Sequence, residues 1–199
     1  MTSAAQQILR RIRGKGRGWV FTPQDFVDIA TRGNTDMILH RQVQDGHIRR
    51  IGRGLYDYPQ IHDKLGMLAP DTKAIAQAVA RQTGDTISLS GATAANLLGL
   101  STQVPGKVVY VTTGKPKKIP VGKRFISLVS SRIPPALLQD DTASLTLRAL
   151  DHLGSKYVDR STVQKCAQNL SDADKARLRQ NLRYIKGSWL NDVARQLAA

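Results

Sequence analysis

Several residue types are missing or scarce in this chain of 199 residues. It has no glutamate, so all 15 acidic residues are aspartates, and they stand against 30 lysines and arginines. Its single cysteine, Cys166, excludes an intramolecular disulfide and a cysteine-based metal cluster. No apolar run approaches the roughly 18 residues that a membrane-spanning helix needs, and residues 1–12 lack the apolar stretch of a signal peptide. We therefore expect a cytoplasmic protein without a membrane partner.

Positive charge is the strongest signal in the composition. The net charge is +15 and the pI is about 10.4, which favours a polyanionic partner and salt-dependent binding to phosphates. Residues 1–60 carry 10 basic and 5 acidic residues, and residues 105–132 carry 7 basic and no acidic ones. Hydrophobic residues make up 41% of the chain, enough for a core in one large or two small domains. We therefore expect a folded protein that binds nucleic acid.

Three short helices and a hairpin are predicted in the first 60 residues. Ser3 suits the N-cap of the first helix, and Thr22-Pro23 suits the start of the second. Gly33 is expected to end the second helix, and Asn34 or Thr35 to cap the third. The apolar side chains expected to point inward from the third helix are Met37, Ile38 and Val43. The expected ranges are helices over residues 3–13, 23–30 and 34–44 and strands over residues 48–50 and 55–58.

The order helix, helix, turn, helix, hairpin is that of a winged helix-turn-helix, in which the third helix enters the major groove. Later segments mix short strands with helices, and the last 60 residues are mostly helical. Two strands, over residues 108–112 and 124–129, are expected to be joined by a basic loop at residues 114–118. The fold class predicted is therefore α+β: a winged helix-turn-helix over residues 1–60, then a mixed α/β domain over residues 61–199 with a helical C-terminus.

Two stretches resemble a known family. Residues 45–59, DGHIRRIGRGLYDYP, closely resemble the end of the N-terminal domain of the AbiEi family, the antitoxins of type IV toxin–antitoxin systems. Residues 90–114, SGATAANLLGLSTQVPGKVVYVTTG, resemble the opening of the second domain in the DUF6088-like branch of this group. The resemblance spans roughly residues 15–130 and covers the helical C-terminus only loosely.

The resemblance implies a protein with two tasks. In such antitoxins the winged helix-turn-helix binds repeats in the promoter of its own operon and represses it. The second domain is associated with countering a nucleotidyltransferase-like toxin, and type IV antitoxins need no stable complex with the toxin. The expected partners are therefore double-stranded DNA of its own promoter and a nucleotidyltransferase toxin. Some relatives are regulators without a toxin, so a stand-alone transcriptional regulator stays open.

Polar residues of the third predicted helix are the first candidates for contacting DNA. Arg41 can donate two hydrogen bonds to a guanine edge, and Asn34 or His40 can contact bases or phosphates. Thr35 is the fourth candidate in this helix. A purely structural interpretation is that Asn34 and Thr35 only cap the helix and that His40 packs against the domain.

Arginines of the hairpin and a later basic segment complete the candidates. Glycines on both sides of Arg53 turn the backbone sharply and expose this side chain. Arg49 and Arg50 fall on opposite faces of a strand, so only one of the two is expected to contact DNA beside Arg53. The second basic patch, which either contacts phosphates or RNA or is simply solvated, comprises Lys107, Lys115, Lys117, Lys118, Lys123 and Arg124.

The sequence contains no catalytic or metal-binding pattern that we recognise. His47, His62 and His152 are scattered, with no HExxH motif, and Gly14–Gly18 lacks the Lys-Ser/Thr ending of a phosphate loop. We therefore predict no enzyme activity, no cofactor and no metal. An RNA-binding module that shields a toxin's target remains the main alternative to a DNA-binding antitoxin.

Overall fold

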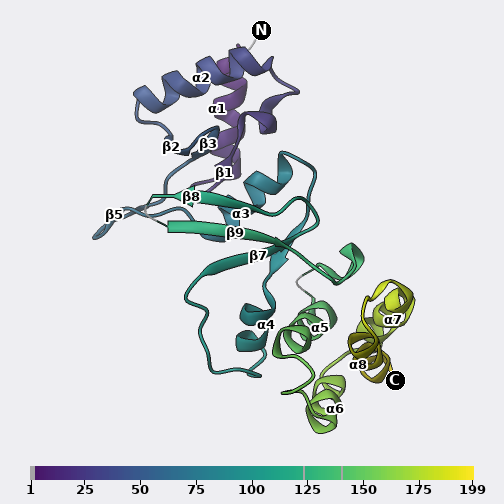
Figure 1. Ribbon diagram of the computed structural model, residues 1–199. Helices are drawn as coiled ribbons and strands as arrows, with labels where there is room; N and C mark the ends of the chain where they lie inside the picture. Colours follow the sequence, from purple (N-terminus) through teal and green to yellow (C-terminus); the bar gives the residue numbers. More distant parts are fainter. Residues whose placement is uncertain (1–2, 123, 140) are drawn as a thin grey trace. The chain divides into compact units, whose positions relative to one another are not determined.

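The computed structural model describes residues 3–122, 124–139 and 141–199 and shows a mixed α+β protein with a helical C-terminal region. The chain divides into two compact units (Figure 1). Unit 1 comprises Met1–Asp85 and Lys118–Ile126, and unit 2 comprises Thr86–Lys117 and Ser127–Ala199. Unit 1 therefore continues past residue 60, where the sequence suggested a boundary, and takes in a later segment of the chain.

Unit 1 begins with helices and a small antiparallel sheet. In the sheet order β1-β3-β2, Phe21 pairs with Tyr56, and Tyr56 also pairs with Arg50 on its other side. Ser3 caps the first helix, as the sequence predicts, through a capping box with Gln6. The elements are α1 (Ala4–Lys15), β1 (Val20–Phe21), a 3-10 helix (Pro23–Phe26), α2 (Arg32–Gln44), β2 (Arg49–Gly52), β3 (Leu55–Asp57), β4 (Ile61–His62), β5 (Gly66–Met67) and α3 (Thr72–Arg81).

An aromatic cluster forms the centre of the unit 1 core. The Phe21 ring is fully buried, and it stacks on Trp19 at 4.7 Å and meets the edge of Phe26 at 5.6 Å. Offset and edge-on ring pairs add stabilisation beyond the area that they bury. The residues of α1, α2 and the sheet that surround these rings are Ile8, Ile12, Ile38, Leu39, Ile48 and Tyr56. The core thus fixes one face of α2 and leaves the opposite face exposed.

Two details of the predicted helices are wrong. The second helix is a short 3-10 turn that ends at Phe26 and not near residue 30. The third helix starts at Arg32 with Thr31 as its N-cap, so Gly33 lies inside its first turn and breaks nothing. Gly33 has a negative φ, and an added Cβ there would contact no atom within 4 Å. A glycine in an exposed first turn is compatible with helix, although the sequence pattern favoured a break.

Later strands of the chain form a four-stranded sheet. The strands of this sheet are β6 (Ile87–Leu89), β7 (Val108–Thr112), β8 (Lys117–Val121) and β9 (Arg124–Ser130), in the order β6-β7-β9-β8. Strand β9 starts in unit 1 and continues into unit 2 from Ser127. The basic loop predicted at residues 114–118 is therefore wrong in part, because Lys117 and Lys118 belong to strand β8.

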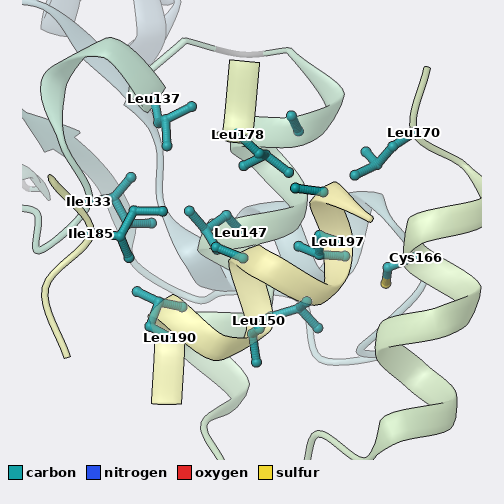
Figure 2. Close-up of a cluster of buried hydrophobic side chains, with 14 of the residues drawn as sticks. Ile133, Leu137, Leu147, Leu150, Cys166, Leu170, Leu178, Ile185, Leu190 and Leu197 are labelled. Carbon is teal, nitrogen blue, oxygen red and sulfur yellow. The ribbon is translucent and has the colours of Figure 1, made fainter. Parts of the chain in front are cut away.

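The remainder of unit 2 is a helical bundle with its own core (Figure 2). Helix α5 runs through its middle and buries Leu147 and Leu150 completely, and Leu178 and Leu197 pack from later helices. Cys166 is also buried there, as the sequence predicts, and burial raises the pKa of its thiol. The helices are α4 (Gly91–Leu97), α5 (Thr142–Leu153), α6 (Arg160–Gln168), α7 (Asp172–Asn181) and α8 (Ser188–Ala198), with 3-10 turns at Pro135–Leu137 and Leu182–Tyr184.

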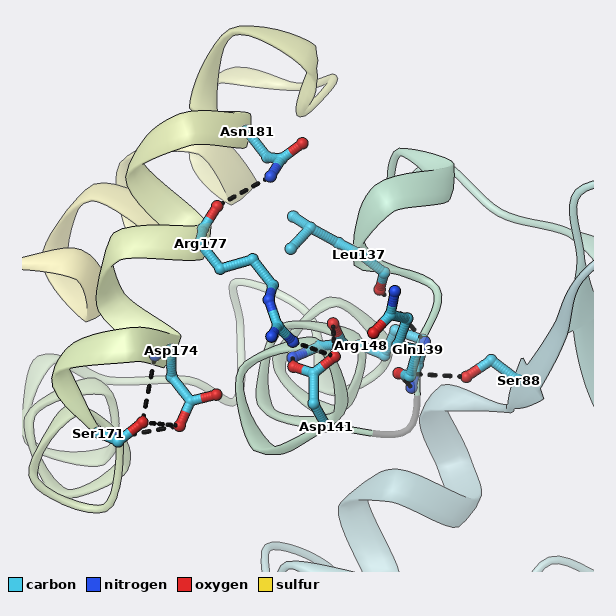
Figure 3. Close-up of polar contacts among 10 residues, drawn as sticks. Ser88, Leu137, Gln139, Asp141, Arg148, Ser171, Asp174, Arg177 and Asn181 are labelled. Atoms are coloured by element: carbon cyan, nitrogen blue, oxygen red, sulfur yellow. Dashed lines mark hydrogen bonds and ion pairs between the residues drawn. The ribbon is translucent and has the colours of Figure 1, made fainter.

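Polar contacts join the segment before α5 to the neighbouring helices (Figure 3). The buried Arg148 guanidinium donates to the carbonyls of Leu137 at 3.3 Å and Gln139 at 2.8 Å. Asp141 caps α5 and forms an ion pair of 2.8 Å with Arg177 of α7. The Arg148 bonds satisfy the carbonyl groups of Leu137 and Gln139. Together with the Asp141–Arg177 pair they tie residues on both sides of the start of α5 to the bundle.

Candidate nucleic-acid interface

Helix α2 presents one buried and one exposed face. The buried face, Thr35, Ile38, Leu39 and Gln42, packs on the unit 1 core. The exposed face, which we call the α2 face, consists of Gly33, Asn34, Met37, His40, Arg41 and Gln44. Residues three and four apart share one side of a helix, so these six residues form one continuous stripe. Three predicted contact residues, Asn34, His40 and Arg41, lie on this stripe.

Two expectations for α2 are wrong. Thr35 is only 1% exposed, so it packs inside the unit and is not available for a DNA contact. Met37 was expected to point inward, yet it is 58% exposed and lies on the α2 face. The buried positions 35, 38, 39 and 42 follow the spacing of one helix face, so residue 37 lies on the opposite face. The Met37 error is therefore a wrong choice of buried face, made from residue type.

The β2–β3 hairpin separates its three arginines into different roles. Arg49 donates to both carboxylate oxygens of Asp57, at 3.0 and 2.6 Å, and to the carbonyl of Leu68 at 2.9 Å. Asp57 is 1% exposed, and its hydrogen bond raises the pKa of the Arg49 guanidinium. Arg49 is therefore engaged in holding the sheet. Arg50 points outward and, among the described residues, its side chain donates to the carbonyl of Gly52 alone, at 3.2 Å, so Arg50 is the one of the two that we keep as a DNA-contact candidate.

Arg53 lies at the tip of this hairpin. Gly52 pairs with Leu55, so Arg53 and Gly54 form the turn between the strands. Gly54 has a φ of +64°, which L side chains rarely adopt, and this glycine allows the tight turn. Arg53 is exposed and has no ion pair or side-chain hydrogen bond among the described residues. Its guanidinium is therefore available to an anion outside the protein.

Arg32 is a basic residue at this surface that the sequence interpretation missed. It is the first residue of α2, and a Cβ added at Gly54 would lie 3.9 Å from its Nη2 atom. The start of α2 thus lies beside the hairpin turn that carries Arg53. Arg32 also forms an exposed ion pair with Asp36, the one acidic residue of α2, at 2.9 Å. The N-cap at Thr31 was the signal that would have placed Arg32 in the first turn.

Three other arginines of unit 1, Arg11, Arg17 and Arg81, are bound to groups of the unit itself. Arg11 forms two hydrogen bonds with Asp28, at 2.7 and 2.6 Å, and these bonds lower the pKa of that aspartate. Arg17 stacks on the Tyr58 ring at 4.9 Å and donates to the carbonyl of Pro59. Arg81 of α3 pairs with Asp25 at 3.0 Å. Arg41, like Arg53, has no such partner among the described residues.

The residues of the second predicted basic patch are divided between the two units. Lys118 and Arg124 belong to unit 1 and are exposed. Lys107, Lys115 and Lys117 belong to unit 2, and Lys117 is half-buried. The call on Lys123 falls outside the described residues. We therefore keep the α2 face and the hairpin tip as the candidate interface.

Within residues 3–122, 124–139 and 141–199, no group of three or more histidine, cysteine and acidic side chains is placed to hold a metal ion. In the same residues, no helix is both long enough and apolar enough to cross a membrane.

Comparison with known sequences places the chain in a family. The profile of DUF6088, described as a family of unknown function, matches residues 7–178. The chain belongs to the DUF6088 family. This DUF6088 protein has no match among curated proteins. Among solved structures it is similar to the "RV2827C protein from Mycobacterium tuberculosis", with 16% identity, a TM-score of 0.43, and coverage of 98% of this chain and 78% of that one.

Proposed function

We propose that unit 1 binds double-stranded DNA as a winged helix-turn-helix. In this proposal α2 lies in the major groove and the β2–β3 hairpin is the wing that follows the backbone. The observation that carries the proposal is the distribution of arginines. Arg11, Arg32, Arg49 and Arg81 of the unit are paired with aspartates. Arg41 on the α2 face and Arg53 at the hairpin tip have no such partner among the described residues, and neither have Arg10 and Arg13 of α1. Arg41 and Arg53 differ from the α1 pair in lying on the helix and the hairpin that a winged helix-turn-helix presents to DNA.

The chemistry of the two surfaces suits different parts of a duplex. The α2 face carries a carboxamide, an imidazole and a guanidinium, from Asn34, His40 and Arg41, and such groups hydrogen-bond to base edges. Arg53 is at the tip of the hairpin turn and Arg32 lies beside Gly54 of the same turn, and guanidinium groups suit phosphate oxygens. Phosphate contacts set the register of a protein on DNA, and base contacts select the sequence.

The biological role that we propose is that of an autoregulatory antitoxin. The support is the resemblance of residues 45–59 and 90–114 to AbiEi antitoxins together with membership of the DUF6088 family. In this role unit 1 would repress the operon, and unit 2 would counter a nucleotidyltransferase-like toxin. A nucleotidyltransferase gene beside this one would support the second half of the role, and its absence would leave a stand-alone regulator.

Binding to the chain's own promoter across a salt series tests the proposal. The full-length protein should bind promoter DNA more tightly than random duplex, because base contacts add to the common phosphate term. Both affinities should fall steeply with salt, since each neutralised phosphate releases counterions. Fluorescence anisotropy at several salt concentrations measures both. Equal affinity for promoter and random duplex at every concentration would refute sequence-specific regulation.

Two variants separate the roles of the interface. Arg41→Ala should weaken promoter binding by about 1–3 kcal/mol and leave random duplex little changed, because a base contact is specific. Arg53→Ala should weaken binding to promoter and to random duplex alike. It should also reduce the slope of log affinity against log salt concentration by about the value of one phosphate contact. Arg160→Ala, which removes an exposed arginine at the start of α6 in unit 2, is the charge control. An identical pattern of losses for Arg41→Ala and Arg53→Ala would contradict the assignment.

A further inference from the structure

Unit 2 contains an open cleft that DNA binding by unit 1 does not explain. The cleft has a volume of about 510 Å³ and lies between the segment around Pro134 and the end of α7 with the turn that follows it. We call it the Tyr184 cleft. The residues on which the argument depends are Arg132, Pro134, Pro135, Asn181, Tyr184 and Lys186. Volumes of 300–1,000 Å³ are typical of small-molecule sites.

The charged groups of the cleft are all positive. Arg132 and Lys186 line it, and no aspartate is among its described lining residues. The Arg132 side chain is 73% exposed and gives Asp151, outside the cleft, one hydrogen bond of 2.9 Å. A guanidinium has five N–H groups, so Arg132 keeps donors for a second anion. Two cations that flank an open volume suit a phosphoryl group.

The remaining walls suit a flat aromatic ring. Tyr184 lines the cleft and is 52% exposed, and Arg183 stacks on its ring at 4.7 Å, so we assign the ligand to the other side of the ring. Pro134 and Pro135 add rigid apolar surface that loses no side-chain entropy on binding. Aromatic side chains stack on nucleobases regardless of base identity, because every base has a π-face.

One polar group is placed to contact the edge of such a ring. The Asn181 Nδ2 atom donates to the carbonyl of Arg177 at 2.9 Å, and Figure 3 shows its oxygen directed away from that bond. The carboxamide oxygen is thus held as an acceptor by its own hydrogen bond. An exocyclic amino group or ring N–H of a base is a donor that fits it.

From these groups we propose that the Tyr184 cleft binds a nucleoside phosphate. The base stacks on Tyr184 against the two prolines, and the phosphate lies between Arg132 and Lys186. The ligand is either a free nucleotide or a nucleotide within a single strand, since both present the same base and phosphate. An acidic peptide would satisfy the cations but would leave the aromatic wall without a planar partner.

Calorimetric titration of the full-length protein tests the site. The probes are the four ribonucleoside triphosphates, inorganic triphosphate, adenosine and a uridine decamer, at about 0.15 M salt to suppress nonspecific charge effects. At least one nucleotide should bind more tightly than inorganic triphosphate and more tightly than adenosine. A decamer that binds more tightly than UTP identifies a single strand as the ligand, and the reverse order identifies a free nucleotide.

Paired variants assign the binding to the cleft. Tyr184→Leu should weaken nucleotide binding on the order of ten-fold and leave inorganic triphosphate unchanged, because it removes only stacking. Arg132→Gln and Lys186→Gln should each weaken the binding of the nucleotide and of inorganic triphosphate. The matched controls are Tyr157→Leu, at a tyrosine that is 80% exposed, and Lys156→Gln, both in unit 2 and outside the cleft. The controls should bind like the unmodified protein.

Three results would overturn the proposal. The first is no heat of binding for any nucleotide at millimolar concentration, on the order of the weakest specific affinities. The second is an equal loss of nucleotide affinity in Tyr184→Leu and Tyr157→Leu, which would indicate nonspecific attraction of nucleotides to a basic protein. The third is inorganic triphosphate that binds as tightly as the best nucleotide, which would make the cleft a simple anion site. None of these outcomes depends on DNA binding by unit 1.

Discussion

Replacing Arg49 by alanine should destabilise the protein through the sheet of unit 1. Arg49 makes three hydrogen bonds, two to the carboxylate of Asp57 and one to the carbonyl of Leu68. Asp57 lies on β3, which pairs with both β1 and β2, and is 1% exposed. The alanine variant would leave this carboxylate buried with its bidentate partner removed, and the Leu68 carbonyl would lose a donor.

The magnitude follows from burial. Removing one member of a buried ion pair costs about 3–5 kcal/mol, because the other charge stays without compensation. The Arg49 side chain is 28% exposed, so water can reach the site and replace part of the lost bonding. We therefore expect about 2–4 kcal/mol, a large share of the 5–15 kcal/mol typical of a domain.

Urea unfolding followed by circular dichroism measures this loss, with Arg50→Ala as the matched control. Arg50 is the next residue along β2 and has one exposed hydrogen bond, to the carbonyl of Gly52, so its replacement should change stability by less than about 0.5 kcal/mol. Where both variants are folded, Arg49→Ala should bind DNA like the unmodified protein. Equal stability of the two variants would refute the structural role of Arg49.

Two further predictions concern packing and acid stability. Gly91→Ala should destabilise unit 2 by about 1–3 kcal/mol, because its Cβ would meet the carbonyl oxygen of Arg148 at 2.6 Å. Gly33→Ala, with no atom within 4 Å, should instead stabilise α2 by about 0.5–1 kcal/mol; urea unfolding of both variants checks the opposite signs. Hydrogen bonds from Ser171 lower the pKa of Asp174. The ionised Asp174 carboxylate therefore stabilises the folded protein above a pH of about 4, and this stabilisation is lost as the pH falls below that value. The melting temperature of Asp174→Asn should therefore fall less between pH 6 and pH 3 than that of the unmodified protein, and an equally steep fall would contradict this cause.

Local signals in the sequence predicted several features correctly. The capping residue Ser3, the turn at Arg53 and Gly54, and the mostly helical last 60 residues all agree with the structure. Each of these depends on residues a few positions apart, such as a cap and its amide or a turn and its glycine. Such short-range interactions can be predicted from the sequence without any knowledge of the tertiary structure.

The sequence alone did not show which group each charged side chain pairs with. The sequence places Arg49 and Arg50 on opposite faces of a strand, but only the structure shows a buried Asp57 beside the first of them. Arg32 reaches the hairpin turn through packing between residues 22 positions apart. The short strand β8 also escaped, because its lysines and proline are unusual in a strand. These features depend on contacts that form only when the chain is folded.

Met37 leads to the last prediction, which depends on the proposed role of α2. Its neighbours three and four positions away, Gly33, Asn34, His40 and Arg41, are all exposed. Met37 therefore occupies the middle of the α2 face and would be central in a complex with DNA. A long apolar side chain cannot hydrogen-bond to a base edge, and the apolar group that the major groove offers is the C5-methyl of thymine. We expect Met37 to contact such a methyl group.

Replacing thymines of the promoter site by uracil, one at a time, removes each methyl group without altering base pairing. Burial of one methyl contributes about 0.8 kcal/mol, so one replacement should weaken binding by about four-fold. Met37→Ala should lose sensitivity to that same replacement, whereas Met67→Ala, at a methionine of β5 that is 54% exposed, should keep it. If every uracil replacement is neutral in a duplex that the protein binds specifically, Met37 does not read thymine, although α2 could still lie in the groove through Arg41. If Met37→Ala shows the same sensitivity as the unmodified protein, the methyl contact belongs to another residue of the interface.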